Sequence, residues 1–162
     1  MPTFRGQSLR TMDDKGRLSL PSKYGKAAGQ AYVVTRGLDN CLFVFLKDEW
    51  RRLEKRLTAL SLESQRARFY VRQMSSHAED TSVDAHGRIM VPPTLRALAG
   101  LEGEVLVIGA LTRIELWNPE TYREYERGFG MTFEDVAESL LEEPPGAPSS
   151  DDAAPRRRKR TR

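Results

Sequence analysis

A nine-residue phrase that occurs twice constrains this chain more than any other feature. Residues 13–21 read DDKGRLSLP and residues 84–92 read DAHGRIMVP, a displacement of 71 positions. Asp, Gly, Arg and Pro recur at identical spacing, and the apolar positions alternate in the same way. A repeat of this length indicates a duplicated unit, so the question is what one unit offers and why the chain carries two.

Each unit is predicted to contain a strand, a tight turn, a second strand, a short helix, two more strands and a terminal helix. Gly16 and Gly87 supply the turn position where a Cβ would clash. A further helix at 62–74 connects the units. Asp48 is the predicted cap of the helix at 49–57, and Asn118, which is followed by a proline, is the predicted cap of the helix at 119–125. The expected strands are 7–12, 17–20, 31–35, 41–45, 105–108 and 113–117, and the expected helices are 21–27, 49–57, 62–74, 92–99, 119–125 and 132–141.

These short strands cannot bury both of their faces alone. We therefore expect the two halves to close one barrel-like core with internal two-fold symmetry. Aromatic side chains are expected in that core rather than on a ligand platform: Trp50, Phe69, Tyr70, Trp117 and Tyr122. The predicted division is a first repeat with its connecting helices at 1–76, a second repeat with the C-terminal helix at 77–142, and a disordered Pro/Ser linker with a basic tail at 143–162.

Composition excludes several classes of protein. The chain has 162 residues, 39% of them hydrophobic and 30% charged, and no apolar stretch approaches the length of a membrane span. The N-terminus lacks the apolar core of a signal peptide, so a cytoplasmic location is expected. The single Cys41 makes no internal disulfide and is expected to be a buried structural thiol.

The net charge of +3 is carried largely by the last residues of the chain. Six Lys or Arg residues and four acids lie within 142–162, which leaves a nearly neutral body. The basic run at 156–160 is able to hold polyanions without a fold, and it is equally consistent with a solubilising tail. A DNA-binding face on the body must therefore come from local clustering of charge.

The two Asp-x-x-Gly-Arg motifs, together with Phe4-Arg5-Gly6 and the segment 113–117, resemble the MraZ family of bacterial transcriptional regulators. The resemblance spans residues 2 to about 142. It implies an α+β, mainly β fold: a tandem-repeat, AbrB/SpoVT-like swapped-hairpin (double-psi-like) barrel with flanking helices. It also implies a nucleoid-associated ring homo-oligomer. Such a ring binds direct repeats of double-stranded DNA in the promoter of a cell-division and cell-wall gene cluster, usually as a repressor.

The residues themselves indicate DNA contact at the motifs. Asp13 and Arg17 are four positions apart across a tight turn, so an ion pair can hold the guanidinium as a planar donor fork for a phosphate or a guanine edge. The alternative is that the pair only staples the turn and Arg17 faces its own chain. The expected DNA-binding residues are Lys15, Arg17, Arg88, His86, Arg5 and Arg10, and the expected turn-stapling residues are Asp13, Asp84, Gly16 and Gly87.

Catalysis has little support in the sequence. His77 and His86 have no cysteine at metal-ligand spacing, and no glycine-rich phosphate loop or nucleophile elbow is present. We expect no catalytic residues, no metal and no cofactor. Two other functions stay open: a DNA-binding antitoxin of the AbrB type, which is usually a single short unit, and a barrel enzyme by analogy of fold.

Overall fold

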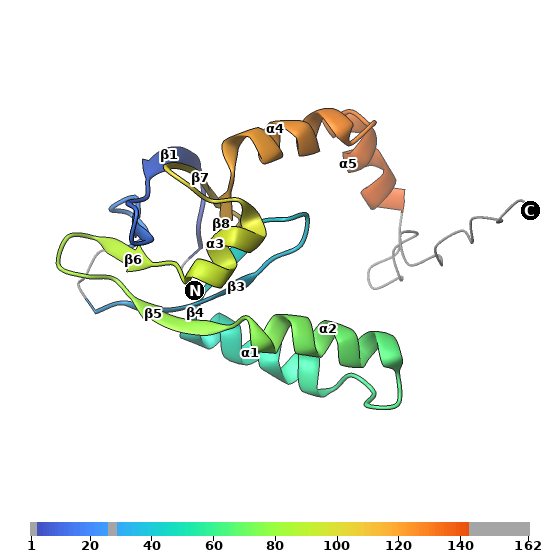
Figure 1. Ribbon diagram of the computed structural model, residues 1–162. Helices are drawn as coiled ribbons and strands as arrows, with labels where there is room; N and C mark the ends of the chain where they lie inside the picture. The colour runs from blue at the N-terminus through green and yellow to red at the C-terminus, as the bar shows by residue number, and fades with distance from the viewer. Residues whose placement is uncertain (1–2, 26–28, 143–162) are drawn as a thin grey trace, which may run out of the picture. The chain divides into compact units, whose positions relative to one another are not determined.

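A computed structural model describes residues 3–25 and 29–142 (Figure 1). The described residues up to 127 belong to one compact unit, and residues 128–142 belong to a second. The elements are β1 (Gln7–Thr11), β2 (Arg17–Ser19), β3 (Ala31–Arg36), β4 (Leu42–Leu46), α1 (Lys47–Thr58), α2 (Gln65–Ser76), β5 (Glu79–Ser82), β6 (Arg88–Met90), α3 (Pro93–Ala99), β7 (Glu104–Gly109), β8 (Ile114–Trp117), α4 (Pro119–Gly128) and α5 (Phe133–Glu142). The predicted linker and basic tail lie outside the described residues.

The strands of the two repeats share one antiparallel sheet. Six strands lie in the order β1-β7-β8-β4-β3-β5, and β2 pairs with β6 in a separate two-stranded ribbon. The first strand of each repeat pairs with a strand of the other repeat, β1 with β7 and β5 with β3. Counted inward from one edge, the strands are β1, β7 and β8; from the other edge they are β5, β3 and β4. These are the equivalent strands of the two repeats, so the strand order has internal two-fold symmetry. The fold is α+β, with mostly antiparallel sheet.

The described strands form no closed barrel, contrary to the sequence expectation. The ribbon strands β2 and β6 have three residues each, and a proline follows each strand within two residues. Proline has no N–H group for a sheet, so neither strand extends further. The ribbon connects to β1 through the isolated bridge between Met12 and Leu18.

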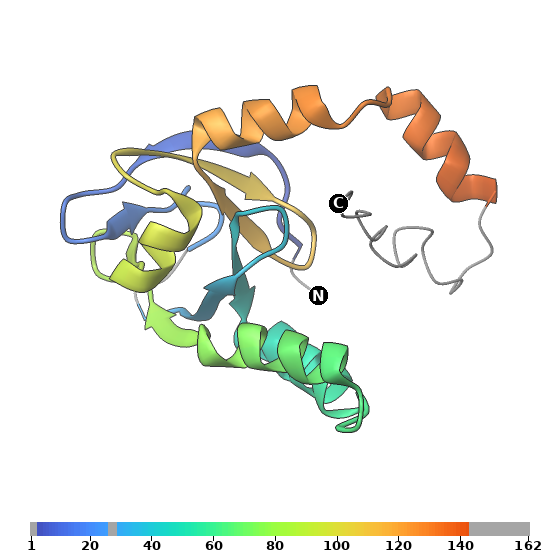
Figure 2. The ribbon, with the colours of Figure 1, turned by 45° about the vertical axis from the view of Figure 1, so that its right-hand side comes forward.

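Alternating side chains build a hydrophobic core on each face of the sheet. One core contains Val34 and Val44 with Leu18 and Ile89 of the ribbon, together with Leu95 of α3. The other core contains the opposite face of β3 and β4, against which α1 and α2 pack side by side as an antiparallel hairpin (Figure 2). Consecutive residues of a strand point to opposite faces of the sheet. Because both faces of β3 and β4 are covered by a core, their sequences are nearly continuous apolar runs.

The predicted helix at 21–27 is wrong for the residues that can be described. Residues 22–24 form a turn, and 26–28 lie outside the described residues. The equivalent segment of the second repeat does form a helix, α3, which begins at Pro93 and ends at Gly100 with a left-handed φ of 62°. The first repeat has Gly25 where α3 has Arg96, and an interior glycine costs a helix about 1 kcal/mol.

Capping predictions had mixed outcomes. Asp48 does not cap α1: the N-cap is Leu46, which makes no side-chain cap bond, and Asp48 pairs instead with Arg51. Asn118 caps α4 as predicted, since its Oδ1 accepts from the backbone N–H groups of Glu120 and Thr121.

The predictions of buried side chains were correct except in α2. Trp50 and Trp117 are buried, and Tyr122 packs partly against the same core. Phe69 is 64% exposed because it lies on the side of α2 away from Met74, the one buried residue of that helix. Cys41 is fully buried, as predicted, and burial raises the pKa of its thiol above the ordinary value.

Candidate nucleic-acid interface

The segment 13–17, called loop 1 below, is a turn closed by one carboxylate. Oδ1 of Asp13 accepts hydrogen bonds from the backbone N–H groups of Lys15 (3.0 Å) and Arg17 (2.9 Å). Its Oδ2 pairs with Nε of Arg17 at 2.6 Å. Gly16 has a φ of +88°, and a Cβ there would lie 2.6 Å from the carbonyl oxygen of Val91. Only glycine fits this position.

The segment 84–88, called loop 2, has the same construction. Oδ1 of Asp84 accepts from the N–H groups of His86 (2.8 Å) and Arg88 (3.0 Å), and its Oδ2 pairs with Nε of Arg88 at 2.9 Å. Gly87 also has a positive φ, +75°, but a Cβ there would meet nothing within 4 Å. The two loops therefore share one hydrogen-bond pattern and differ in how tightly they are packed.

The loop hydrogen bonds favour the ionised form of both aspartates. The pKa of Asp13 lies below its ordinary value, chiefly because the backbone N–H of Arg17 donates to the carboxylate and secondarily because of the guanidinium. The pKa of Asp84 is lowered in the same way, first by the N–H of Arg88. Each carboxylate is thus held as the anion that fixes its arginine.

The ribbon places the two loops at its opposite ends. Arg17 lies opposite Met90, and Arg88 lies opposite Ser19. The loops are tied to the ends of the partner strands, since Val91 N–H donates to the Gly16 carbonyl (2.8 Å) and Leu20 N–H to the Gly87 carbonyl (3.0 Å).

Both arginines lie on the same face of the ribbon. Leu18 and Ile89, which lie opposite each other, are buried on the inner face. Side chains alternate along a strand and directly opposed residues share a face, so Arg17, Ser19 and Arg88 lie on the outer one. The side chains of Arg17 and Arg88 are 36% and 29% exposed. The outer face of the ribbon is therefore a small basic surface with two arginines held in fixed positions.

Two further arginines lie at the ends of this ribbon, one for each loop. Arg10 of β1 donates to the carbonyl and hydroxyl oxygens of Ser19, at the end of the ribbon nearest loop 2. Arg96 of α3 donates to the carbonyl oxygens of Val91 (3.1 Å) and Asp14 (3.4 Å), beside loop 1. Sequence reasoning missed Arg96. The available signal was its departure from the repeat, because the position 71 residues earlier is Gly25.

The other predicted residues divide between the loop tips and a distant position. Lys15 and His86 are exposed at equivalent positions of loops 1 and 2. Arg5 is exposed just before β1, and its neighbour Phe4 bridges to Leu111 in the β7–β8 turn. Loop 1 follows the other end of β1, so the structure does not bring Arg5 to the loops.

The described residues offer neither a metal site nor a membrane-spanning helix. They contain no group of three or more His, Cys, Asp or Glu side chains that could hold a metal ion. No helix among residues 3–25 and 29–142 is long and apolar enough to cross a membrane.

These features define a class: a tandem-repeat α+β protein that presents two stapled Asp/Arg loops on one exposed ribbon. The model of the family described as "MraZ protein, putative antitoxin-like" matches the chain twice, at residues 3–73 and 74–143. The chain belongs to the MraZ family, and the resemblance inferred from the sequence is confirmed.

Curated relatives cover most of the chain. The "Transcriptional regulator MraZ" of Caldanaerobacter subterraneus subsp. tengcongensis is 42% identical over 135 residues, which is 83% of this chain and 94% of the relative. The protein of the same name from Heliobacterium modesticaldum is 42% identical over 139 residues, 86% of this chain and 97% of the relative.

Proposed function

We propose that this chain is a transcriptional regulator that binds double-stranded DNA in a sequence-specific manner through the outer face of the β2–β6 ribbon. One observation carries the proposal: Arg17 and Arg88 are each fixed by an aspartate and lie on the same exposed face. The names of the relatives, transcriptional regulators, support the same function.

The geometry matches what DNA recognition requires. The hydrogen bonds that fix Arg17 and Arg88 use Nε, which leaves the terminal nitrogens of the guanidinium to donate to a guanine edge or a phosphate. The major groove, about 12 Å wide, admits a two-stranded ribbon. Lys15 at the tip of loop 1 and the arginines at the ribbon ends, Arg10 and Arg96, are placed to contact the flanking phosphates.

The resemblance to the MraZ family supports finer proposals. We place this chain on direct repeats in the promoter of a bacterial cell-division and cell-wall gene cluster, as a repressor that forms a ring of identical copies in the cytoplasm and on the nucleoid. The exchange of first strands between the repeats, β1 to β7 and β5 to β3, is what two AbrB/SpoVT-like units with swapped hairpins would produce. On this view residues 1–76 and 77–142 are the two units.

A gel-shift measurement tests the DNA-binding proposal. The probe is the duplex directly upstream of this chain's own reading frame, in competition with a scrambled duplex of equal length. The wild-type protein should shift the promoter duplex preferentially. The double variant R17A/R88A should lose this preference, whereas R66A, which removes an exposed arginine of α2, should retain it.

Circular dichroism of each variant shows whether the fold is intact. An unchanged preference in a folded R17A/R88A protein would mean that the ribbon does not read the sequence. Equal binding of the wild-type protein to both duplexes would reject specific recognition altogether.

A further inference from the structure

Helix α5 presents an apolar stripe to solvent. Phe133, Val136, Ala137, Leu140 and Leu141 recur at the spacing of one helix face, and Phe133 and Leu141 are 84% and 87% exposed. The remaining face carries acids and no basic residue: Glu134, Asp135, Glu138 and Glu142. A stripe of this kind, bordered by charge of one sign, is typical of a helix that docks into an apolar groove.

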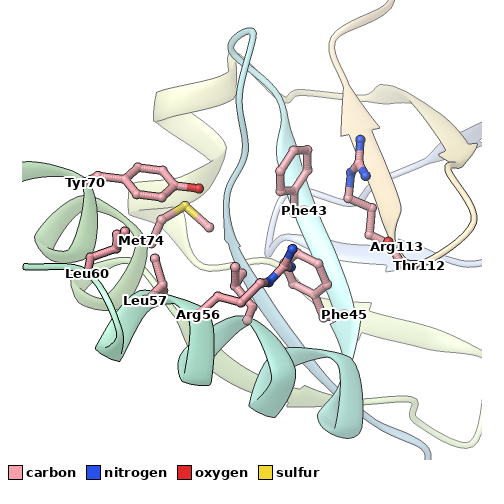
Figure 3. A pocket seen from close by; sticks show the side chains of 10 residues that line it. Phe43, Phe45, Arg56, Leu57, Leu60, Tyr70, Met74, Thr112 and Arg113 are labelled. Atoms are coloured by element: carbon pink, nitrogen blue, oxygen red, sulfur yellow. The ribbon is translucent and has the colours of Figure 1, made fainter. Parts of the chain in front are cut away.

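The α1–α2 hairpin contains such a groove. A hollow of about 290 Å³ lies between the hairpin and the sheet, where Phe43, Phe45 and Leu57 form its floor and wall (Figure 3). A second hollow of about 420 Å³ lies between the helices and is lined by residues that include Leu62 and Val71. Leu57 and Leu60 line both hollows, so the two are adjacent, and together they are called the hairpin groove below.

The charge on the hairpin groove is opposite to that on α5. Arg56 and Arg113 line the first hollow, where Figure 3 shows their side chains beside the phenylalanines, and Arg68 and Arg72 line the second. Arg113 is ion-paired with Glu115 at 2.8 Å, so the basic charge of the rim comes from Arg56, Arg68 and Arg72. Among the described residues, no Asp or Glu lines either hollow. The apolar stripe of an acidic amphipathic helix would therefore match the apolar floor of the groove, and its acids would match the basic rim.

We propose that α5 of one copy docks into the hairpin groove of a second copy. The ten residues of α5 form a rod about 15 Å long, which presents nearly three turns of apolar stripe. Because helix and groove are different surfaces, the contact is head-to-tail, and it generates a closed ring or an open filament rather than a two-fold dimer. This inference rests on the self-assembly in the proposed function and names the contact that produces it.

Two variants, each defective in one of the two surfaces, test the contact. The helix variant, L140Q/L141Q, replaces two exposed leucines of the apolar stripe by glutamine, a residue of good helix propensity. The groove variant, R56E/R72E, reverses charge on the rim. Light scattering of the wild-type protein at micromolar concentration should give a multiple of the chain mass, and each variant alone should give the mass of one chain. The mixed variants should form 1:1 dimers and nothing larger, because each pair then has one intact helix facing one intact groove.

Controls on the same elements separate the contact from general effects of substitution. S139Q changes the polar side of α5, and R66E reverses a charge on α2 that lies outside the groove; both should assemble like the wild type. Circular dichroism should be the same for all variants, since the altered side chains are exposed.

The failures are distinguishable. Variants that keep the full wild-type mass, or a mixture that stays monomeric, would overturn the helix-in-groove contact while leaving assembly and DNA binding in place. A monomeric wild-type protein would reject assembly itself, and the contact with it. Preferential binding of the promoter duplex is measured separately and does not depend on either result.

Discussion

At the scale of single residues, the two loops are stapled alike but differ in the charges around them. Equivalent positions 71 residues apart hold Lys15 and His86, Arg10 and Thr81, Arg96 and Gly25. Each of these arginines lies beside the loop of the other repeat: Arg10 is at the end of the ribbon nearest loop 2, and Arg96 is beside loop 1. Each loop thus has one neighbouring arginine, and the remaining difference lies at the tips, where loop 1 has Lys15 and loop 2 has His86.

This difference predicts unequal effects on DNA affinity. K15A should reduce the slope of log affinity against log salt concentration by about one, because one phosphate contact is lost. H86A should reduce the slope less, since it removes no lysine or arginine from the proposed interface. R17A should lower the affinity by about 10- to 100-fold, the usual loss for one base contact. The loss for R88A should be smaller. Fluorescence anisotropy titrations between 50 and 200 mM salt provide the measurement, and equal slopes for K15A and H86A would contradict it.

The Asp–Arg ion pairs of the two loops also predict a pH dependence of stability. The pKa values of Asp13 and Asp84 are lower in the folded protein, so both contribute stability that is fully present above their ordinary value of about 3.9. That contribution is lost as the pH falls through the lower folded value. The variant D13N/D84N should therefore melt below the wild type at pH 6, and the gap in Tm should shrink below about pH 4. A gap that stays constant down to pH 2 would show that the charges do not stabilise the loops.

At the scale of elements, the backbone of the N-terminal segment comes close to Gly109 at the end of β7. A Cβ at Gly109 would lie 2.4 Å from the backbone nitrogen of Arg5 and 2.6 Å from the Tyr24 hydroxyl. G109A should therefore destabilise the protein by about 1–3 kcal/mol, the usual cost of overpacking. G128A, whose Cβ would meet nothing within 4 Å, should change the free energy of unfolding little or raise it. Urea unfolding compares the two, and similar midpoints would contradict the expected crowding.

Element positions were predictable where the chain carries local signals. The alternating residues before Pro21 and Pro92 predicted β2 and β6, and proline after Asn118 predicted the start of α4. The helix at 21–27 was mispredicted because Pro21 was interpreted as a helix start, although the segment also contains Gly25, which disfavours a helix. The position of Arg96 and the open sheet depend on contacts between distant segments, which no local pattern encodes.

At the scale of the whole molecule, the strand pairing explains why the two repeats share a chain. Both edge strands of the sheet, β1 and β5, pair only with strands of the other repeat, and the ribbon takes one strand from each. Neither repeat by itself has a partner for its first two strands. The covalent link keeps those partners at high local concentration, and it holds the two Asp/Arg loops at a constant separation on one ribbon.

The ribbon has only three residues in each strand, whereas specific protein–DNA interfaces bury about 1,000–2,500 Å² of protein surface. Several copies in one assembly would engage adjacent repeats together, so each further contact forms at a high effective concentration. We expect the affinity for a duplex with three direct repeats to exceed that for one repeat by about 100-fold or more. The assembly-defective L140Q/L141Q protein should bind both duplexes with the same affinity per site, equal to that of the wild type for one repeat. Anisotropy titrations of the two proteins on the two duplexes measure this, and equal wild-type affinity for one and three repeats would show that the copies bind DNA independently.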